Sequence, residues 1–176
     1  MNLILGYNIY NENYKEGIKM KQSKKVSESY TQHVQILSQS SLNGYKRLFG
    51  GKLMEWIDIV AAVVARRHCN KNVTTASVDS LVFKKPAFAN DTLVLEGFIT
   101  YAGTTSMEIC VKTYVENLDG SRDNINTAFL VMVALDEHGK KTEVPSLIIE
   151  TEEEKQNFEA AQKRKEYRKM CAQNGF

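Results

Sequence analysis

The sequence of 176 residues lacks any apolar run long enough to cross a membrane, and its charges nearly cancel, leaving a formal net charge of +2. No membrane-spanning segment is therefore expected, and nucleic acid is not favoured as a partner on charge alone. The apolar run Leu3–Leu5 is too short for the hydrophobic region of a signal peptide. We expect a cytoplasmic protein of ordinary globular composition.

Cysteine and histidine are scarce, with three residues of each. The cysteines are odd in number and have no metal-ligand spacing, so we expect reduced thiols rather than disulfides or a metal site. The histidines form no triad pattern with a serine or cysteine, and we expect each to be an ordinary surface or interface residue. The residues concerned are Cys69, Cys110, Cys171, His33, His68 and His138.

What remains suits one domain, because a chain of this length buries enough surface for a single core. Met20 opens a lysine-rich polar stretch, and we expect residues 1–25 to be a poorly ordered N-terminal extension. Residues 26–150 are predicted to form the domain, and residues 151–176 a C-terminal helix. No internal repeat or low-complexity tract interrupts this division.

Hydrophobic periodicity predicts one strand, one buried helix and four further strands. Residues 31–37 alternate as a strand does, whereas residues 51–69 are apolar nearly all round, which is typical of a buried helix. Four strand-like runs follow at residues 73–83, 92–101, 106–116 and 124–135. The order favours an α+β fold in which an antiparallel sheet wraps around one helix. Such a sheet has an open edge, so we expect at least a homodimer.

The two faces of the sheet and the last helix carry different residues. In residues 106–116 apolar side chains alternate with charged ones, which predicts one covered face and one wetter face. Thr151 and Glu154 form the pattern of a capping box at the start of the C-terminal helix. We expect the charges of this helix to form a solvated face.

Asp58 is the least expected residue of the central helix, since it lies between Ile57 and Ile59. Burying an unpaired carboxylate costs several kcal/mol, so we expect Asp58 either to have a polar partner or to do chemistry. A desolvated carboxylate has a raised pKa, which suits a general base near neutral pH.

Gly50 and Gly51 stand where this helix begins, and helix N-termini carry unpaired N–H groups and a positive dipole end. Such N–H groups can polarise an acyl oxygen, although a glycine pair is also a common turn. Asn43 precedes them in a loop. It can orient a water molecule, or simply form a turn with Gly44.

Four ordered stretches resemble one known family: NGYKRLFGGKLMEWID at 43–58, ARRH at 65–68, VTTASVD at 73–79 and YAGTTSMEI at 101–109. They look like the hotdog-fold acyl-CoA thioesterases of the broad-specificity bacterial and brain acyl-CoA hydrolase type. The resemblance extends from about residue 26 to the end of the last helix. It implies a hotdog fold, a dimer with one continuous sheet, and commonly a trimer of dimers, that is, a homohexamer.

The resemblance also implies the chemistry. The expected reaction is hydrolysis of an acyl-CoA thioester to a free fatty acid and CoA, with no metal or other cofactor. A carboxylate at the position of Asp58 acts as general base or nucleophile in this family. An asparagine at the position of Asn43, from the facing subunit, and a threonine at the position of Thr75 assist it. The amides of Gly50 and Gly51 would bind the thioester carbonyl.

CoA carries phosphates, which call for basic side chains and backbone N–H groups. Basic candidates are Arg66, Arg67, Lys84 and Lys85. The resemblance adds the turn formed by Gly103, Thr104, Thr105 and Ser106, along the path of the pantetheine arm.

Two alternatives stay open. A hotdog-fold dehydratase acting on hydroxyacyl thioesters would need a histidine and a carboxylate facing one site, and no histidine lies near Asn43 or the helix start. A non-catalytic acyl-CoA sensor would lack the carboxylate and carry a DNA-binding segment. Spacing constrains how Asp58 and the glycines can act on one thioester, since Asp58 is ~10 Å along the helix axis from Gly51. We therefore expect Asp58 to act with the glycines and Asn43 of a partner chain.

Overall fold

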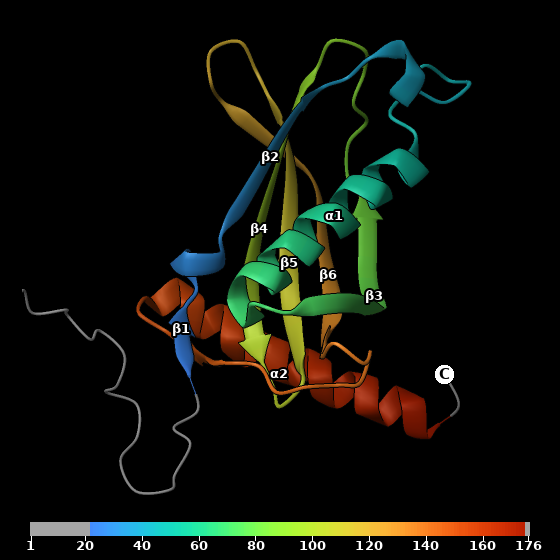
Figure 1. The fold of residues 1–176 in the computed structure, drawn as a ribbon. Helices are drawn as coiled ribbons and strands as arrows, with labels where there is room; N and C mark the ends of the chain where they lie inside the picture. Colours follow the sequence, from blue (N-terminus) through green and yellow to red (C-terminus); the bar gives the residue numbers. More distant parts are fainter. Residues whose placement is uncertain (1–21, 175–176) are drawn as a thin grey trace, which may run out of the picture.

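The computed structural model describes residues 22–174, which form a curled antiparallel sheet with one helix on each side (Figure 1). The strand order in the five-stranded sheet is β2, β4, β5, β6, β3, and β1 pairs with β7 in parallel. The elements are β1 (Ser23–Lys25), β2 (Thr31–Ile36), α1 (Gly50–Cys69), β3 (Asn72–Phe83), β4 (Thr92–Ala102), β5 (Ser106–Glu116), β6 (Arg122–Leu135), β7 (Ser146–Ile148) and α2 (Glu152–Gln173), with 3-10 turns at Ser27–Ser29 and Gln39–Ser41.

This architecture confirms the predicted α+β fold with a sheet wrapped around a helix. Residues 1–21 of the predicted extension lie outside the described residues. The end of that extension differs from the prediction, because residues 23–25 form β1 and pair with residues 146–148. Three-residue strands carry too little pattern to be read from sequence.

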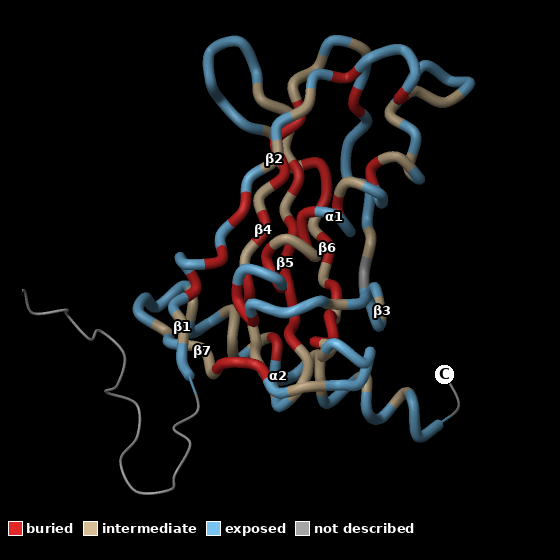
Figure 2. The backbone as a smooth tube through the Cα atoms, in the orientation of Figure 1, coloured by how far each residue is buried: buried red, intermediate tan, exposed pale blue. Residues whose placement is uncertain are grey.

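Helix α1 lies against one face of the sheet because one side of it is continuously apolar (Figure 1). Leu53, Ile57, Val60 and Val64 recur at intervals of three and four and are all buried. The helix sits so close to β4 that a Cβ on Gly97 would lie 2.6 Å from Val60 Cγ1. These contacts form the centre of the core, where Figure 2 shows the buried segments of helix and sheet together.

The C-terminal end of α1 is fixed by its cap and by a buried histidine. Asn70 adopts the left-handed conformation with a φ of 53° and donates its N–H to the Arg66 carbonyl. His68 is fully buried and hydrogen-bonded to the Pro145 carbonyl oxygen at 3.1 Å, so the expectation of a surface or interface residue is wrong for it. Burial lowers the pKa of His68 from its ordinary value of 6.5.

Helix α2 crosses the opposite face of the sheet. Its predicted capping box is confirmed, because Thr151 Oγ1 accepts the Glu154 N–H and Glu154 Oε2 accepts the Thr151 N–H. Near its start, the Phe158 ring packs against Tyr101 of β4. Farther along, the Arg164 guanidinium lies 3.7 Å from the centroid of the Phe129 ring of β6.

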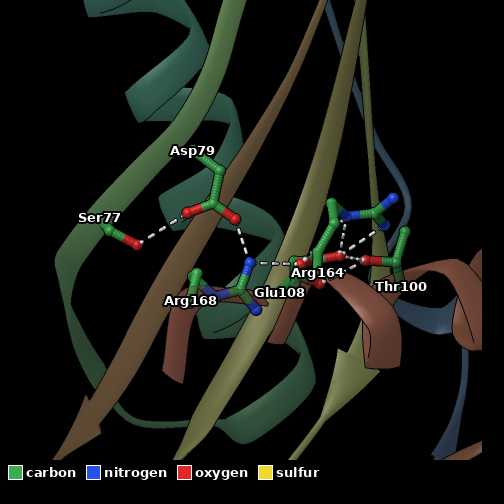
Figure 3. A network of polar contacts seen from close by, with 6 residues as sticks. All are labelled: Ser77, Asp79, Thr100, Glu108, Arg164 and Arg168. Atoms are coloured by element: carbon green, nitrogen blue, oxygen red, sulfur yellow. Dashed lines mark hydrogen bonds and ion pairs between the residues drawn. The ribbon is translucent and has the colours of Figure 1, made fainter. Parts of the chain in front are cut away.

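The predictions of a solvated charge run on α2 and of a wetter sheet face are wrong at the centre of this contact. Glu108 of β5 is 1% exposed, although it belongs to the charged face. Its carboxylate accepts hydrogen bonds from Thr100 and Arg164 at 2.8 and 2.7 Å, and from Arg168 at 2.8 Å (Figure 3). The alternating pattern identified the outward face, but it gave no sign that a helix covers it.

Candidate active site

The hydroxyl of Thr75 donates a hydrogen bond of 2.6 Å to the carboxylate of Asp58. Asp58 lies midway along α1 and Thr75 near the start of β3, so the contact joins the helix to the last strand of the sheet. Thr75 pairs across the sheet with the buried Met132, and this register turns its side chain toward α1. Two residues 17 positions apart (75 − 58) thereby become neighbours.

Asp58 is exposed in the single chain, so the predicted buried setting is wrong for one subunit on its own. The reason is geometric, since Ile57 and Val60 point into the core, whereas Asp58 lies at the border of this buried side, where it reaches Thr75 and remains open to solvent. Its neighbours there are themselves apolar and exposed, with Met54 at 46% and Ile59 at 50%. An apolar surface around a carboxylate is typical of a face that another chain covers.

The start of α1 presents N–H groups that its N-cap residue does not bond through a side chain. Phe49 is the N-cap residue and makes no side-chain cap hydrogen bond. Gly50 and Gly51 follow it, and the first N–H groups of a helix have no intrahelical acceptor. Both glycines also have a packing reason, because a Cβ on Gly50 would lie 3.2 Å from the Phe83 ring and one on Gly51 2.7 Å from the Phe49 ring. The result is a positive helix end that a ligand oxygen can approach.

A cavity of about 410 Å³ opens at this helix end. Its lining includes four of the residues predicted from sequence, namely Asn43, Gly50, Lys84 and Lys85. Lys84 Nζ donates to Asn124 at 2.9 Å, and Lys85 Nζ pairs with Asp123 at 2.6 Å. The hydrogen bond from Lys85 is the main cause that lowers the pKa of Asp123. Both lysines are thus held at the mouth of the cavity by neighbours.

The side chain of Asn43 shapes the loop that borders this cavity. Its Oδ1 accepts the N–H groups of Tyr45 and Arg47 at 2.9 and 3.2 Å. These two bonds are those of an Asx turn, which was the plainer of the two interpretations of Asn43. The amide nitrogen of the side chain, in contrast, donates to no acceptor among residues 22–174, and it remains available to a ligand or water.

The predicted site residues of one chain therefore form two groups. Asp58 and Thr75 make one, while Asn43, Gly50 and the two lysines make the other. Eight residues of helix separate Gly50 from Asp58, or about 12 Å along the axis. Within one chain, the Asp58 carboxylate and the N-terminal end of α1 are therefore too far apart to contact the same thioester group.

The remaining predicted CoA contacts lie apart from the cavity. The turn Gly103–Thr105 and Ser106 connect β4 to β5 at the opposite end of the sheet, where the Thr104 and Thr105 carbonyls accept N–H groups of Val144 and Ala134. Arg67 is held by the Tyr30 carbonyl and the Thr31 hydroxyl, at 2.8 and 3.0 Å.

Arg66 belongs to a different hollow, which it lines together with Asn70, Lys71 and Asn72. The contacts of Arg66, Arg67 and residues 103–106 with CoA stay predictions.

The sequence analysis missed the aromatic residue of the cavity. Phe83 is 51% exposed and packs on Gly50, and the lining also includes Pro86 and Arg47. The signal was present in the chain, because Phe83 directly precedes the two predicted lysines. Its meaning depended on β3 ending beside the start of α1, which no local pattern shows.

A five-stranded antiparallel sheet curled around one long helix defines the hotdog class of proteins. The family model described as the thioesterase superfamily matches residues 45–119. An apo-hexameric acyl-CoA thioesterase of known structure is similar to the chain with a TM-score of 0.83 and 44% identity, covering 86% of this chain and 97% of that one. The chain belongs to the hotdog-fold thioesterase superfamily.

Two further relatives are informative. An uncharacterized acyl-CoA thioester hydrolase of Bacillus subtilis is 48% identical over 113 residues, which span 64% of this chain and 66% of that protein. Other curated relatives are matched over as little as 22% of their length. The acyl-CoA hydrolase of Staphylococcus aureus, solved with butyryl coenzyme A, is 35% identical with a TM-score of 0.83, covering 86% of this chain and 93% of that one.

The Staphylococcus aureus enzyme has also been solved as three alanine variants, of an asparagine, an aspartate and a threonine. The intervals between these three positions equal those between Asn43, Asp58 and Thr75.

No helix among residues 22–174 combines the length and apolar composition required to span a bilayer.

Proposed function

We propose that this protein hydrolyses acyl-CoA thioesters, with Asp58 as the catalytic carboxylate and Thr75 as its hydrogen-bonding partner. The observation that carries the proposal is the 2.6 Å bond between these two side chains, beside the exposed apolar residues Met54 and Ile59 of α1. Membership of the thioesterase superfamily supports the reaction class. The matching intervals in the Staphylococcus aureus variants support the choice of Asn43, Asp58 and Thr75.

In the proposed reaction, Asp58 removes a proton from water as the water oxygen attacks the thioester carbonyl carbon. The carbonyl oxygen gains the negative charge, and N–H groups at a helix start such as Gly50 and Gly51 stabilise it. The C–S bond then breaks, CoA leaves as a thiolate that takes up a proton, and the fatty acid remains. Direct attack by the Asp58 carboxylate, followed by hydrolysis of the anhydride, leads to the same products. Neither route needs a resident metal or cofactor.

The helix end that serves Asp58 belongs to a second chain in this proposal, because about 12 Å of helix separates the two groups within one chain. β3 is an edge strand that pairs on one side only within the described sheet, and its Val78 and Val82 are 44% and 56% exposed. Edge strands of this kind pair with a copy of themselves. We propose a dimer through β3, assembled further into a trimer of dimers; hexameric assemblies among the structural relatives support this.

Lys84 and Lys85 at the cavity mouth are proposed to meet the phosphates of CoA, since ammonium groups suit phosphate oxygens. Arg67 and the segment Gly103–Ser106 lie apart from the cavity of their own chain. In this proposal they contact a CoA molecule only when another chain of the assembly brings it to them. A cytoplasmic location belongs to the same proposal and is supported by the three free thiols.

Replacing Asp58 tests the catalytic assignment. We expect Asp58→Asn to lower kcat by about 10²- to 10⁴-fold, the usual contribution of general-base catalysis. Release of free CoA from acyl-CoAs of several chain lengths measures it. Glu55→Gln is the matched control, because Glu55 lies near Asp58 on the exposed surface of the helix and pairs, among residues 22–174, only with Lys52. Wild-type protein that releases no CoA, or Asp58→Asn at the wild-type rate, would overturn the proposal.

Mixing two inactive variants tests the shared site. Asp58→Asn and Asn43→Ala are each expected to be inactive, but a mixed dimer contains one site with both native residues. Random reassociation after mild denaturation should restore about a quarter of the wild-type rate, because half of the dimers are mixed and half of their sites are intact. No recovery, despite mass measurements that show mixed dimers, would place the whole site within one chain.

A further inference from the structure

Asp79 lies in a polar network that connects β3 to α2 on the side of the sheet away from α1 (Figure 3). Its carboxylate accepts a hydrogen bond from the Ser77 hydroxyl at 3.2 Å and pairs with Arg168. Arg168 also contacts the buried Glu108 at 2.8 Å. The Asp79 side chain is only 15% exposed, so the network holds it firmly although β3 is an edge strand.

β3 does not pair regularly with β6 in this region. Its register shifts between Thr75 and Ser77 and again between Val78 and Ser80. Ala76 and Asp79 are the residues without a partner, which is the signature of a β-bulge at each of them. The network therefore contacts β3 at the second bulge, through Asp79, and next to the first bulge, through Ser77.

These bulges decide which face Thr75 occupies. Thr75, Val78 and Leu81 pair with Met132, Leu130 and Ala128, all of which are buried in the core beside α1. In a regular strand, side chains alternate between the two faces of the sheet. Residues three positions apart, such as these, would therefore lie on opposite faces. The bulge at Ala76 keeps Thr75 on the α1 side, and a shift of register by one residue would turn it away from Asp58.

We infer that Asp79 is a positioning residue for the thioesterase reaction: held by Arg168 and Ser77, it fixes the double bulge of β3 and so aims the Thr75 hydroxyl at Asp58. This inference rests on the proposed roles of Asp58 and Thr75. Asp79 itself faces α2 and does not touch the reacting atoms. It links the outer helix to the catalytic face through the backbone of four residues, 76–79.

The charges of the network favour this role. Two carboxylates, Glu108 and Asp79, meet two guanidiniums, Arg164 and Arg168. Glu108 already has Arg164 and Thr100, so Arg168 is not needed to satisfy it alone. Asp79 in contrast has Arg168 as its only cationic partner among the described residues. Arg168 therefore connects Asp79 of the edge strand β3 to Glu108 of β5, which Arg164 and Thr100 already hold in place.

A double-mutant cycle between Asp79 and Thr75 tests the inference. We expect Asp79→Ala to lower kcat by about tenfold, the equivalent of ~1.4 kcal/mol, while KM changes less than twofold. In a Thr75→Ala background the same substitution should lower kcat no further, because the group that it positions is gone. A merely structural effect would instead add to that of Thr75→Ala.

Two controls make the result decisive. Glu116→Ala removes a carboxylate that is bonded to Arg122 at the far end of β5, and it should leave kcat unchanged. Asp79→Asn keeps the shape of the side chain and enters the same cycle if Asp79→Ala does not fold. A wild-type kcat for the Asp79 variants, or effects that multiply with Thr75→Ala, would overturn the inference.

Hydrogen exchange separates this failure from failure of the proposed function. Asp79→Ala should lower amide protection at residues 75–78 relative to Glu116→Ala, whether or not any acyl-CoA is hydrolysed. Inactive wild-type protein with this loss of protection would contradict the thioesterase proposal only. Active wild-type protein with unchanged protection in Asp79→Ala would contradict the positioning role only.

Discussion

Two carboxylates on opposite sides of the same sheet have opposite surroundings. Asp58 on α1 is exposed in the single chain and accepts one hydrogen bond, from Thr75, among the described residues. Glu108 on β5 is 1% exposed and is bonded by Thr100, Arg164 and Arg168. The first carboxylate keeps acceptor capacity that no donor among residues 22–174 uses, whereas the second accepts hydrogen bonds from three side chains.

The difference separates a group that can react from one that fastens two layers together. A carboxylate with unused acceptor capacity can take a proton from water, which general-base catalysis requires. A carboxylate surrounded by guanidiniums contributes to the fold, and its removal leaves cations without their partner. We therefore expect substitutions of Asp58 to affect activity and substitutions of Glu108 to affect stability.

The largest stability effect is expected for Glu108→Gln. Removing the charge leaves Arg164 and Arg168 facing a neutral amide, and loss of one partner of a buried pair costs about 3 kcal/mol in the free energy of unfolding. The corresponding fall in Tm is about 6–12 °C for a chain of this size. Asp58→Asn, an exposed position, should change that free energy by less than about 0.5 kcal/mol.

Thermal unfolding of wild type and both variants, at one protein concentration, measures this contrast. Equal Tm values for Glu108→Gln and wild type would remove the distinction between the two carboxylates. A larger loss for Asp58→Asn than for Glu108→Gln would reverse it.

A smaller effect is expected from His68, which is buried as Glu108 is but forms no ion pair within the described part of the chain. Burial lowers its pKa below 6.5, with the Pro145 hydrogen bond opposing the shift. The unfolded chain therefore binds a proton as the pH falls through about 6.5, while the native chain does not, so stability present above that pH is lost below it. The slope cannot exceed about 1.4 kcal/mol per pH unit for one proton.

Unfolding by urea between pH 7.5 and 5 measures this dependence in wild type and His68→Gln. The variant should lose less stability on acidification. The exposed His138 gives the matched control, because His138→Gln should follow wild type. Parallel pH profiles for wild type and His68→Gln would show that burial of this ring does not disfavour its protonation.

Much of the fold was predictable because its elements are long. The hydrophobic alternation of β5 and the three-four spacing of α1 repeat over enough residues to fix type and boundaries. The pair of β1 and β7 was missed because each has three residues. The bulges at Ala76 and Asp79 were missed as well, since a bulge depends on the register with β6 and not on residue type.

The site was predictable in residue types but not in setting. Asp58 attracted notice as a charge among apolar neighbours, and the structure confirms that it has a polar partner. Its exposure was not foreseen, because sequence neighbours on a helix point to different sides and only packing shows which side is covered. The role of α2 was hidden for a similar reason, as Arg164 and Arg168 look like any solvated basic residues until Glu108 lies beneath them.

Gly97 gives the architecture a mechanical property. At this point the side chains of Val60 and Val64 rest directly on the backbone of β4, since a Cβ on Gly97 would lie within 3 Å of both. The helix carries Gly50 at its first position and Asp58 near its middle. A side chain at position 97 would push α1 away from the sheet and displace Asp58 relative to Thr75. The position of Asp58 relative to Thr75 thus depends on a glycine at the contact between α1 and β4.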